Sequence, residues 1–351
     1  MTAAKKKNSR RKQARFRSSR RKRIRNTVLL LFLLVVLGGT GIGAIYVLRN
    51  GTVFDKLEDA YVASREFSGG ITDLDSLRAD GFAKNLCEVV SDVPMDGVSL
   101  GENQKGLLLD LDDRKVLYSK QALQKVYPAS ITKIMTAMLA LKYGNMDDVV
   151  TITQENLNLE EGSQVCGFWA GDQVTMDQLL HCLLVYSGND AAAAIAEHVG
   201  GSTDGFVEMM NSYARELGCT GTHFTNPHGL QDENHYTTPY DIYLMLKEAL
   251  NYPEFTQITQ SGSYTVEYTH ADGSSASTTL LATDHYLTGE ATPPKNVTIL
   301  GGKTGTTDNA GNCLALLSQN AYGKPYISIV MGASTKDELY EQMSSLLQNI
   351  N

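Results

Sequence analysis

A segment of 22 residues without one charged side chain, Thr27 to Leu48, constrains this chain more than any other feature. As a helix it extends over roughly 30 Å, about the thickness of the hydrocarbon layer of a bilayer. Thirteen lysines and arginines precede the segment, and Arg49 follows it. The positive-inside rule therefore predicts a basic cytoplasmic tail at 1–26, a single transmembrane signal-anchor helix at 27–48, and an extracytoplasmic remainder held at the cell membrane.

Two alternatives to this interpretation concern the segment and the tail. Small residues in "GTGIGA" fit a cleaved secretory signal, although the apolar core is long for one. The charge of the tail suits nucleic acid, but a basic tail beside a membrane segment more often contacts anionic lipid headgroups. All 39 acidic residues and 17 of the 31 basic ones follow Arg49, so this part has a net charge of −22, which argues against a nucleic-acid partner.

Beyond the membrane segment the sequence predicts a stalk at 49–100 and one α+β domain at 101–351. Strand patterns at both ends of that domain, with helical patterns between them, indicate that its first and last segments share one sheet. The expected elements are a hairpin over 105–120, a helix from 129 that ends at Gly144, mostly helices over 145–250, a hairpin and a long loop over 260–296, and three short strands before a final helix from about Lys336.

The five cysteines of the chain have no metal-ligand spacing. We expect most of them to be small buried hydrophobic residues. Cys166 and Cys182 are a candidate disulfide that the sequence alone does not establish, and an odd number of cysteines leaves at least one thiol unpaired outside a cell. The five are Cys87, Cys166, Cys182, Cys219 and Cys313.

Three short motifs occur in an order that carries chemistry: Ser-x-x-Lys at Ser130 to Lys133, Ser-x-Asn at Ser187 to Asn189, and Lys-Thr-Gly at Lys303 to Gly305. Each is weak alone, because Ser-x-x-Lys also occurs twice in the basic tail and a lone Ser130 suits a helix cap. In context, the first motif opens a predicted helix, the second ends an apolar helix, and the third ends a strand. This combination is typical of penicillin-binding proteins and class A β-lactamases.

The spacing of Ser130 and Lys133 suits a nucleophile and its base. Residues i and i+3 share one face of a helix, so the amine can reach the hydroxyl. A free serine is a poor nucleophile, and lysine serves as its base only where burial or a second cation destabilises the ammonium. We expect the neighbouring apolar side chains to bury the amine and Lys303 to supply the second positive charge. Near a helix N-terminus, the backbone N–H of Ser130 also faces a developing oxyanion.

Glycines before and after Lys303 leave a strand edge open. Without a side chain at Gly305, an extended peptide can lie against this strand as an additional strand. Lys303 and the hydroxyls of Thr304 and Thr306 then face the carboxylate of such a peptide. The third motif therefore predicts a binding site for a peptide with a free carboxyl end.

The chain resembles the low-molecular-weight penicillin-binding proteins, the serine-type D-alanyl-D-alanine carboxypeptidases, from about Lys105 to about Leu347. The stretches "YPASITKIMTA", "LLVYSGNDAAAAIAEHVGGS", "THFTNPHGLQDENHYTTPYDI" and "GGKTGTTDNAGNCLALLS" are all similar to that family. The resemblance implies a β-lactamase/transpeptidase-like fold, an antiparallel sheet flanked by helices with a mostly helical subdomain, and a catalytic domain at 101–351.

The resemblance also implies an activity: removal of the terminal D-alanine from peptidoglycan stem peptides through an acyl-enzyme on Ser130, with β-lactams as covalent inhibitors. Lys133 takes the proton of the serine, and the backbone N–H groups of Ser130 and Thr306 hold the oxyanion. Neither a metal nor an organic cofactor is implied. The implied catalytic residues are Ser130, Lys133, Ser187 and Asn189, and the implied substrate-binding residues are Lys303, Thr304, Gly305 and Thr306.

This chain departs from the family near the expected site. Many relatives have an Asn-rich segment before the Lys-Thr-Gly strand, where this chain has "TTLLATDHYL". An arginine often follows the last strand, and here the nearest basic residue is Lys336. The histidines of "THFTNPHGLQDENHY" lack the His-Glu-x-x-His pattern of a zinc site.

Two other functions are alternatives to the carboxypeptidase. A class A β-lactamase needs a glutamate in Glu-x-x-Leu-Asn after the Ser-x-Asn motif, whereas "ENLN" at Glu155 precedes that motif. A non-catalytic wall-binding protein keeps the fold without the activity, and the intact motifs argue against it. The sequence leaves open the third residue of the stem peptide, endopeptidase activity on cross-links, a role in growth, sporulation or septation, and the oligomeric state.

Overall fold

The structure, a computed structural model, describes residues 85–350. The predicted basic tail, the predicted transmembrane segment at 27–48 and most of the predicted stalk lie outside the described residues. Among the helices within 85–350, none combines the length and the apolar character needed to cross a bilayer.

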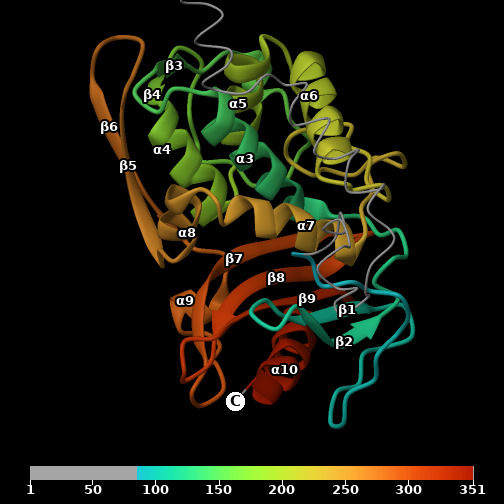
Figure 1. Cartoon of the computed structure of the whole chain (residues 1–351). Helices are drawn as coiled ribbons and strands as arrows, with labels where there is room; N and C mark the ends of the chain where they lie inside the picture. Colours follow the sequence, from blue (N-terminus) through green and yellow to red (C-terminus); the bar gives the residue numbers. More distant parts are fainter. Residues whose placement is uncertain (1–84, 351) are drawn as a thin grey trace, which may run out of the picture. The chain divides into compact units, whose positions relative to one another are not determined.

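A five-stranded antiparallel sheet in the order β2-β1-β9-β8-β7 lies at the centre of the described residues (Figure 1). β1 pairs with β9, with Leu107 opposite Ile329, so the prediction that the first and last strands share one sheet is confirmed. The last three strands have nine or ten residues and are longer than predicted. The strands are β1 (Lys105–Asp110), β2 (Lys115–Lys120), β7 (Thr298–Thr307), β8 (Gly311–Gln319) and β9 (Pro325–Ala333).

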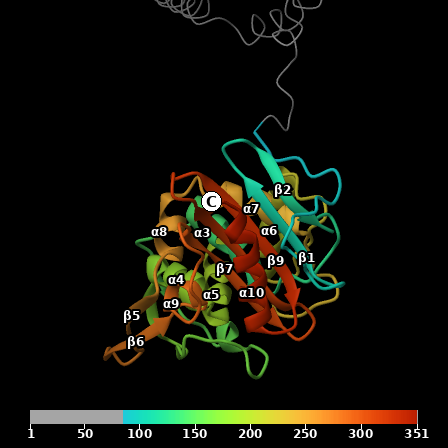
Figure 2. The ribbon, with the colours of Figure 1, turned by 90° about the horizontal axis from the view of Figure 1, so that it is seen from below.

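Helix α10 (Lys336–Leu347) covers one face of this sheet, and Figure 2 shows it from that side. Leu339 and Met343 lie one turn apart on the helix and pack in one apolar cluster with Leu314 of β8. Thr335 begins the helix, because its side chain accepts a hydrogen bond from a backbone N–H of the first turn. The final helix predicted from about Lys336 is therefore confirmed.

The other face of the sheet packs against a mostly helical part of the chain (Figure 1). Gly144 is the C-cap of α3, so the predicted helix end is confirmed. Residues 145–250 are less helical than predicted, because two short strands and irregular segments interrupt them. The helices of this part are α3 (Lys133–Tyr143), α4 (Met176–His181), α5 (Asn189–Gly200), α6 (Thr203–Glu216), α7 (Pro239–Ala249) and α8 (Pro253–Thr259).

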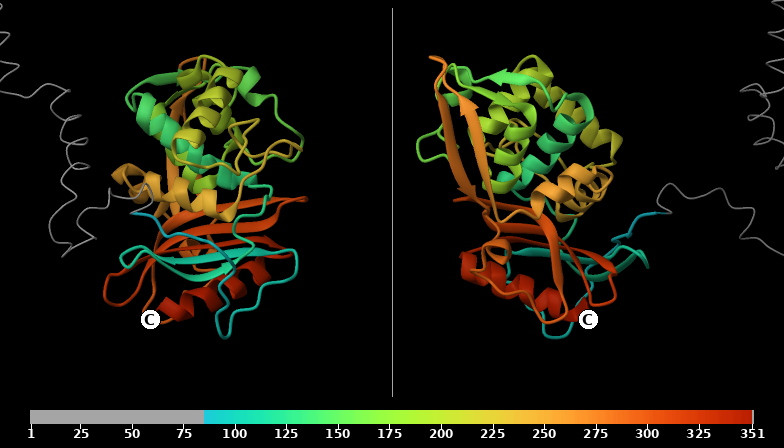
Figure 3. Two further views of the ribbon diagram at one scale, coloured as in Figure 1. Left: turned by 45° about the vertical axis from the view of Figure 1, so that its right-hand side comes forward. Right: turned by 90° about the vertical axis from the view of Figure 1, so that its left-hand side faces the viewer.

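A second sheet in the order β3-β4-β5-β6 flanks these helices. Its strands β5 (Ser263–Thr269) and β6 (Ser275–Leu281) form the hairpin predicted over 260–296, which rises along the side of the helices in Figure 3. β3 (Val149–Thr151) and β4 (Gln173–Thr175) complete it. The loop after the hairpin contains the short helix α9 (His285–Thr288), which the sequence did not predict.

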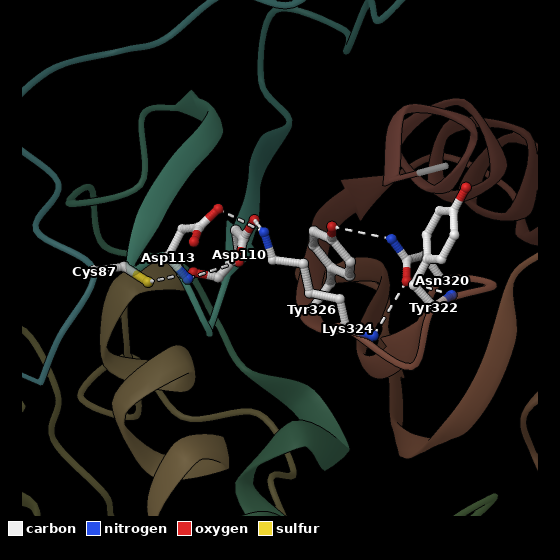
Figure 4. Close-up of polar contacts among 7 residues, drawn as sticks. All are labelled: Cys87, Asp110, Asp113, Asn320, Tyr322, Lys324 and Tyr326. Atoms are coloured by element: carbon white, nitrogen blue, oxygen red, sulfur yellow. Dashed lines mark hydrogen bonds and ion pairs between the residues drawn. The ribbon is translucent and has the colours of Figure 1, made fainter.

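Lys324 joins the turn of the hairpin predicted over 105–120 to the turn that precedes β9 (Figure 4). Its Nζ lies 2.6 Å from Oδ2 of Asp110 and 2.6 Å from Oδ2 of Asp113. Hydrogen bonds to these carboxylates raise the pKa of Lys324. Because Asp110 ends β1 and Lys324 precedes β9, the contact joins the adjacent ends of these two paired strands.

Residues 85–100 pack against the domain. The backbone N–H of Cys87 donates to the hydroxyl of Tyr243 at 2.9 Å, and the buried Cys87 thiol lies 3.4 Å from the carbonyl of Asp110. Val93 pairs with Ser119 of β2. The packed part of the chain therefore begins before residue 101, the expected start of the domain.

The cysteines are buried free thiols in the described part of the chain, as predicted for small hydrophobic residues. The candidate disulfide between Cys166 and Cys182 is not formed there. Instead, a hydrogen bond between the two side chains, together with burial, raises the pKa of the Cys166 thiol.

Candidate active site

Ser130 and Lys133 lie on consecutive helical turns. The 3₁₀ turn η1 (Ala129–Thr132) carries the serine and leads into α3, whose first residue is the lysine. The three-residue spacing brings Lys133 Nζ to 2.9 Å from Ser130 Oγ. The amine also contacts Oδ1 of Asn189 at 2.7 Å and the carbonyl of His228 at 2.8 Å, so three oxygens fix its position.

The environment of Lys133 favours the neutral amine. The side chain is fully buried, and burial holds its pKa well below the usual range of a lysine. The positive charge of Lys303 lowers this pKa further, whereas Asp190 acts weakly in the opposite direction. Lys133 can therefore accept a proton from Ser130 at a pH where an exposed lysine is charged.

The second motif follows a π-helical turn, η3 (Cys182–Tyr186). Ser187 leaves this turn with a φ of +71°. A left-handed backbone costs roughly 1 kcal/mol or more in a residue with a Cβ. This turn allows Ser187 to reach Lys303, while Asn189, the first residue of α5, reaches Lys133.

Gly188, between these two residues, has no room for a side chain. A Cβ at this position would lie 2.3 Å from Sγ of Cys166 and 2.9 Å from Oδ1 of Asp190. Asp190 in turn accepts the backbone N–H of Cys166 at 2.8 Å. The segment around Cys166 thus packs directly against the second motif.

Lys303 lies on β7 with 1% of its surface exposed. Its Nζ donates to Ser187 Oγ at 2.9 Å and to the carbonyl of Thr304 at 3.0 Å. Burial lowers the pKa of Lys303 to about 7, and the carboxylate of Asp284 acts against this shift. The attraction of Asp284 thus favours the charged form of Lys303, the form that can hold a substrate carboxylate.

The threonines on either side of Gly305 already have hydroxyl partners. Thr304 forms a hydrogen bond with the hydroxyl of Thr283, and Oγ1 of Thr306 donates to a side-chain amide oxygen of β8 at 3.1 Å. Gly305 itself approaches the turn of the nucleophile so closely that a Cβ would lie 3.0 Å from the backbone N of Ser130. The glycine therefore lets the third motif pack directly against the first.

A chain of hydrogen bonds outside the three motifs holds the turn of the nucleophile. Ala129 has a φ of +47°, which is strained for an alanine. The hydroxyl of Thr132 donates to the Ala129 carbonyl at 2.8 Å and lies 2.8 Å from Nε2 of His235. Nδ1 of His235 accepts the backbone N–H of Thr225 at 3.0 Å, so the chain requires a neutral ring with its proton on Nε2. Burial lowers the pKa of His235 to about 4, which favours this neutral form.

Gly229 lies against the same turn and has a φ of +88°. A Cβ there would lie 1.9 Å from the carbonyl oxygen of Ala129. These contacts give the stretch "NPHGLQDENHY" a structural role that no local pattern in the sequence predicts. Within residues 85–350, no group of three or more His, Cys, Asp or Glu side chains lies where it could hold a metal ion.

A cavity of about 330 Å³ brings the predicted site residues together. Lys133 and Lys303 are buried below it and contact the two serines that line it. Lys336, the basic residue closest to the last strand, also lines this cavity, as do Gly162 to Gln164 and Tyr340. The predicted residues that line it are Ser130, Ser187, Asn189, Thr304, Gly305 and Thr306.

This arrangement suits acyl transfer. One serine has a buried amine beside it that can take its proton, and a second serine shares a hydrogen bond with a buried lysine that can hold an anion. The site therefore has a nucleophile, a base, a proton donor for a leaving group and a cation for a carboxylate.

Comparison with known proteins agrees with this chemistry. The family model described as D-alanyl-D-alanine carboxypeptidase, Peptidase S11, matches residues 101–335. The D-alanyl-D-alanine carboxypeptidase DacF of Bacillus subtilis is 36% identical over 251 residues, which are 70% of this chain and 61% of that relative. DacC of Escherichia coli is 33% identical over 253 residues, 69% of this chain and 59% of the relative. The chain thus spans about three fifths of the length of these curated relatives.

Solved structures have the same arrangement of antiparallel sheets and helices. The Streptomyces K15 DD-transpeptidase is 27% identical, with a TM-score of 0.65, over 74% of this chain and 98% of that one. The D-alanyl-D-alanine carboxypeptidase of Mycobacterium tuberculosis H37Rv is 28% identical, with a TM-score of 0.63, over 74% of this chain and 93% of that one.

Proposed function

The chain belongs to the D-alanyl-D-alanine carboxypeptidase family, and from that premise we propose that it removes the terminal D-alanine from peptidoglycan stem peptides. The observation that carries the proposal is the fully buried Lys133, whose amine lies 2.9 Å from Ser130 Oγ and whose pKa is well below its usual range. A base of this kind activates a serine at neutral pH without a metal or an imidazole.

In the proposed reaction, Ser130 Oγ attacks the carbonyl carbon between the last two D-alanines while Lys133 takes the hydroxyl proton. The carbon–nitrogen bond then breaks, and the leaving amine takes the proton of the Ser187 hydroxyl. The proton held by Lys133 passes to Ser187 in its place, so Lys133 is neutral again, while Lys303 keeps its charge and its hydrogen bond to Ser187. Asn189 holds Lys133 and the acyl side of the peptide. Water attacks the resulting ester, with Lys133 again as base, and restores the Ser130 hydroxyl.

The third motif supports recognition of the carboxyl end. Lys303 is buried but can keep its proton near neutral pH, and Thr304 lines the cavity beside it. In this proposal they bind the terminal carboxylate, and the backbone N–H groups of Ser130 and Thr306 hold the oxyanion. Gly305 lets the peptide approach β7 as an added strand.

We place the enzyme at the cell membrane, with residues 27–48 as its anchor and the catalytic part outside. The sequence supports this through the uncharged segment and the thirteen basic residues before it. Protease treatment of intact cells tests the orientation. Digestion of the catalytic part without cell lysis is expected, and full protection of that part would contradict the proposal.

The experiment that tests the activity uses the full chain in detergent micelles and a stem pentapeptide that ends in D-alanyl-D-alanine. We expect release of one equivalent of D-alanine and covalent labelling by a fluorescent penicillin. Ser130→Ala should abolish both signals, whereas Ser345→Ala on α10, remote from the cavity, should leave both unchanged. A wild-type protein that releases no D-alanine and takes no penicillin would overturn the proposal in favour of a wall-binding protein.

Nitrocefin separates the carboxypeptidase from a β-lactamase. Glu155, the glutamate of "ENLN", begins the short helix η2 (Glu155–Leu157), and it is not among the described residues that line the site. We therefore expect the acyl-enzyme formed with a β-lactam to persist for minutes. Recovery of free enzyme within seconds would favour the β-lactamase.

A further inference from the structure

A second cavity, of about 600 Å³, begins where β7 ends. Thr307, the last residue of β7, lines the cavity at Ser130, and the next two residues, Asp308 and Asn309, line the second one. At the start of β8, Gly311 lines the second cavity and Asn312 lines the cavity at Ser130. The two cavities therefore lie on consecutive residues of one strand pair.

Four charged side chains line this second cavity: Lys105, Lys125, Glu233 and Asp308. Within the described residues, none of these four forms an ion pair with another. Lys125 Nζ lies 3.6 Å from the centre of the Tyr236 ring, and Lys105 Nζ donates to a backbone carbonyl at 2.7 Å. The cavity thus offers two cations and two anions to a ligand that has both signs of charge.

The direction in which a peptide binds along β7 determines which of its residues reaches the second cavity. In the proposed reaction the terminal carboxylate binds at Lys303 and the scissile carbonyl faces the backbone N–H groups of Ser130 and Thr306. The peptide then runs along β7 from Lys303 toward Asp308 as it is followed from its carboxyl end. An extended strand advances about 3.4 Å per residue. One residue before the acylated D-alanine, the peptide is therefore beside Thr307 and Asp308.

We propose that the second cavity binds the side chain of the residue before the two D-alanines, the third of the stem peptide, and selects a side chain that ends in both an ammonium and a carboxylate. This inference rests on the proposed carboxypeptidase activity and deepens it. Glu233 and Asp308 bind the ammonium, and Lys125 and Lys105 bind the carboxylate.

The arrangement of charge explains why a diamino dicarboxylic side chain fits better than lysine. A lysine side chain offers only an ammonium and leaves Lys105 and Lys125 without a counter-charge. An apolar side chain leaves all four charges unpaired. Partly exposed ion pairs are individually weak, so the two additional contacts of the carboxylate are expected to change kcat/KM by roughly three- to tenfold.

The test compares three pentapeptides that differ at the third residue: diaminopimelic acid, lysine and norleucine. For the full chain in micelles we expect kcat/KM to decrease in that order. In Lys105→Met/Lys125→Met the ratio of the diaminopimelyl to the lysyl peptide should fall to about one. In Glu233→Gln/Asp308→Asn the ratio of the lysyl to the norleucyl peptide should fall to about one. Matched controls on exposed charges elsewhere, Lys115→Met and Glu216→Gln, should leave both ratios unchanged.

The outcomes separate this inference from the function on which it rests. Equal kcat/KM on the three peptides, or a preference for lysine or norleucine, would overturn the inference and leave the carboxypeptidase intact. Unchanged ratios in both double variants, with melting temperatures like that of the wild type, would also overturn it. Release of D-alanine from none of the peptides would overturn the proposed function and this inference with it.

Discussion

At the scale of single residues, the site depends on two buried lysines with opposite requirements. Lys133 must be neutral to take a proton, and Lys303 must be charged to hold a carboxylate. Burial lowers the pKa values of both lysines, and the positive charge of Lys303 adds to the lowering at Lys133. The carboxylate of Asp284 stabilises the charge of Lys303. The negative charge of Asp284 thus favours the charged form of Lys303, and the positive charge of Lys303 favours the neutral form of Lys133.

Asp284→Asn tests this separation. Asp284 is 6% exposed, and its Oδ2 has no hydrogen-bond partner within the described residues. Loss of its negative charge lowers the pKa of Lys303 below about 7, so the cation is lost at a lower pH. KM for the pentapeptide is expected to increase as the pH rises and Lys303 loses its charge. In Asp284→Asn this increase should begin at a lower pH than in the wild type. Asp337→Asn, an exposed acid on α10, is the control, and a KM profile like that of the control would contradict the assignment.

The repulsion between the two lysines predicts that the pKa of Lys133 rises when the charge of Lys303 is removed. Lys303→Met removes the positive charge that lowers the pKa of Lys133, so that pKa rises. The rate of acylation by fluorescent penicillin increases with pH as Lys133 loses its proton. We expect this increase to move to higher pH in the variant, whatever the loss in absolute rate. An unmoved midpoint would show that the two amines do not interact.

At the scale of elements, the sequence predicted those whose signals are local. The hairpin over 105–120 has an alternating pattern and a turn of acidic residues, and α3 ends at a glycine, so both were predictable. The π-helical turn before Ser187 and the short strands β3 and β4 were not. They depend on contacts with distant segments: β4 pairs with β5, nearly a hundred residues later.

Gly188→Ala tests how tightly the second motif is supported. The added methyl group would lie 2.3 Å from Cys166 Sγ, and relief of that clash moves Ser187 and Asn189. A misplacement of this size is expected to lower kcat/KM by roughly tenfold or more. Cys166→Ala on its own should have little effect, and Gly188→Ala/Cys166→Ala should recover part of the lost activity because the sulfur is gone. A double variant no better than Gly188→Ala would exclude the clash with the sulfur as the cause.

At the scale of the whole molecule, the site joins segments that are remote in sequence. The order of the three motifs predicted that Ser130, Ser187 and Lys303 meet, and the strand patterns predicted a shared sheet. The side chains that support them, such as Asp284 and His235, were not predictable, because their roles depend on which loop lies behind which motif. The burial of Lys133 was predictable from the apolar residues beside it, whereas no local pattern in the sequence indicates the burial of Asp284 or His235.

Buried histidines predict that global stability falls in acid. His228 and His235 have pKa values lowered to about 3 and about 4, mainly by burial, whereas the unfolded chain binds protons at about 6.5. The unfolded state therefore binds more protons between about pH 6.5 and pH 4, and the free energy of unfolding decreases as the pH falls through this range. Protonation of each histidine on unfolding lowers the free energy of unfolding by a few kcal/mol at most.

Urea unfolding at pH 7.5 and pH 5 measures this loss. We expect His235→Gln to be less stable than the wild type at pH 7.5, because the hydrogen bonds to Thr132 and Thr225 are disturbed. The same variant should lose less stability between the two pH values, because one titrating group is gone. An identical loss in variant and wild type would mean that His235 is not titrated on unfolding.

The pairing of β1 with β9 has a consequence for the time course of folding. Leu107 meets Ile329, so the central sheet closes only after almost the whole chain has been made. Contacts at such long separation in sequence form slowly, whereas the backbone hydrogen bonds within each helix between 133 and 259 join residues close in sequence and can form early. We therefore expect a refolding intermediate in which the helical part is ordered while the first hairpin still lacks its partner. Until β9 pairs with it, β1 has an open edge that can pair with another chain, so a chaperone that shields this edge would raise the yield of folded protein.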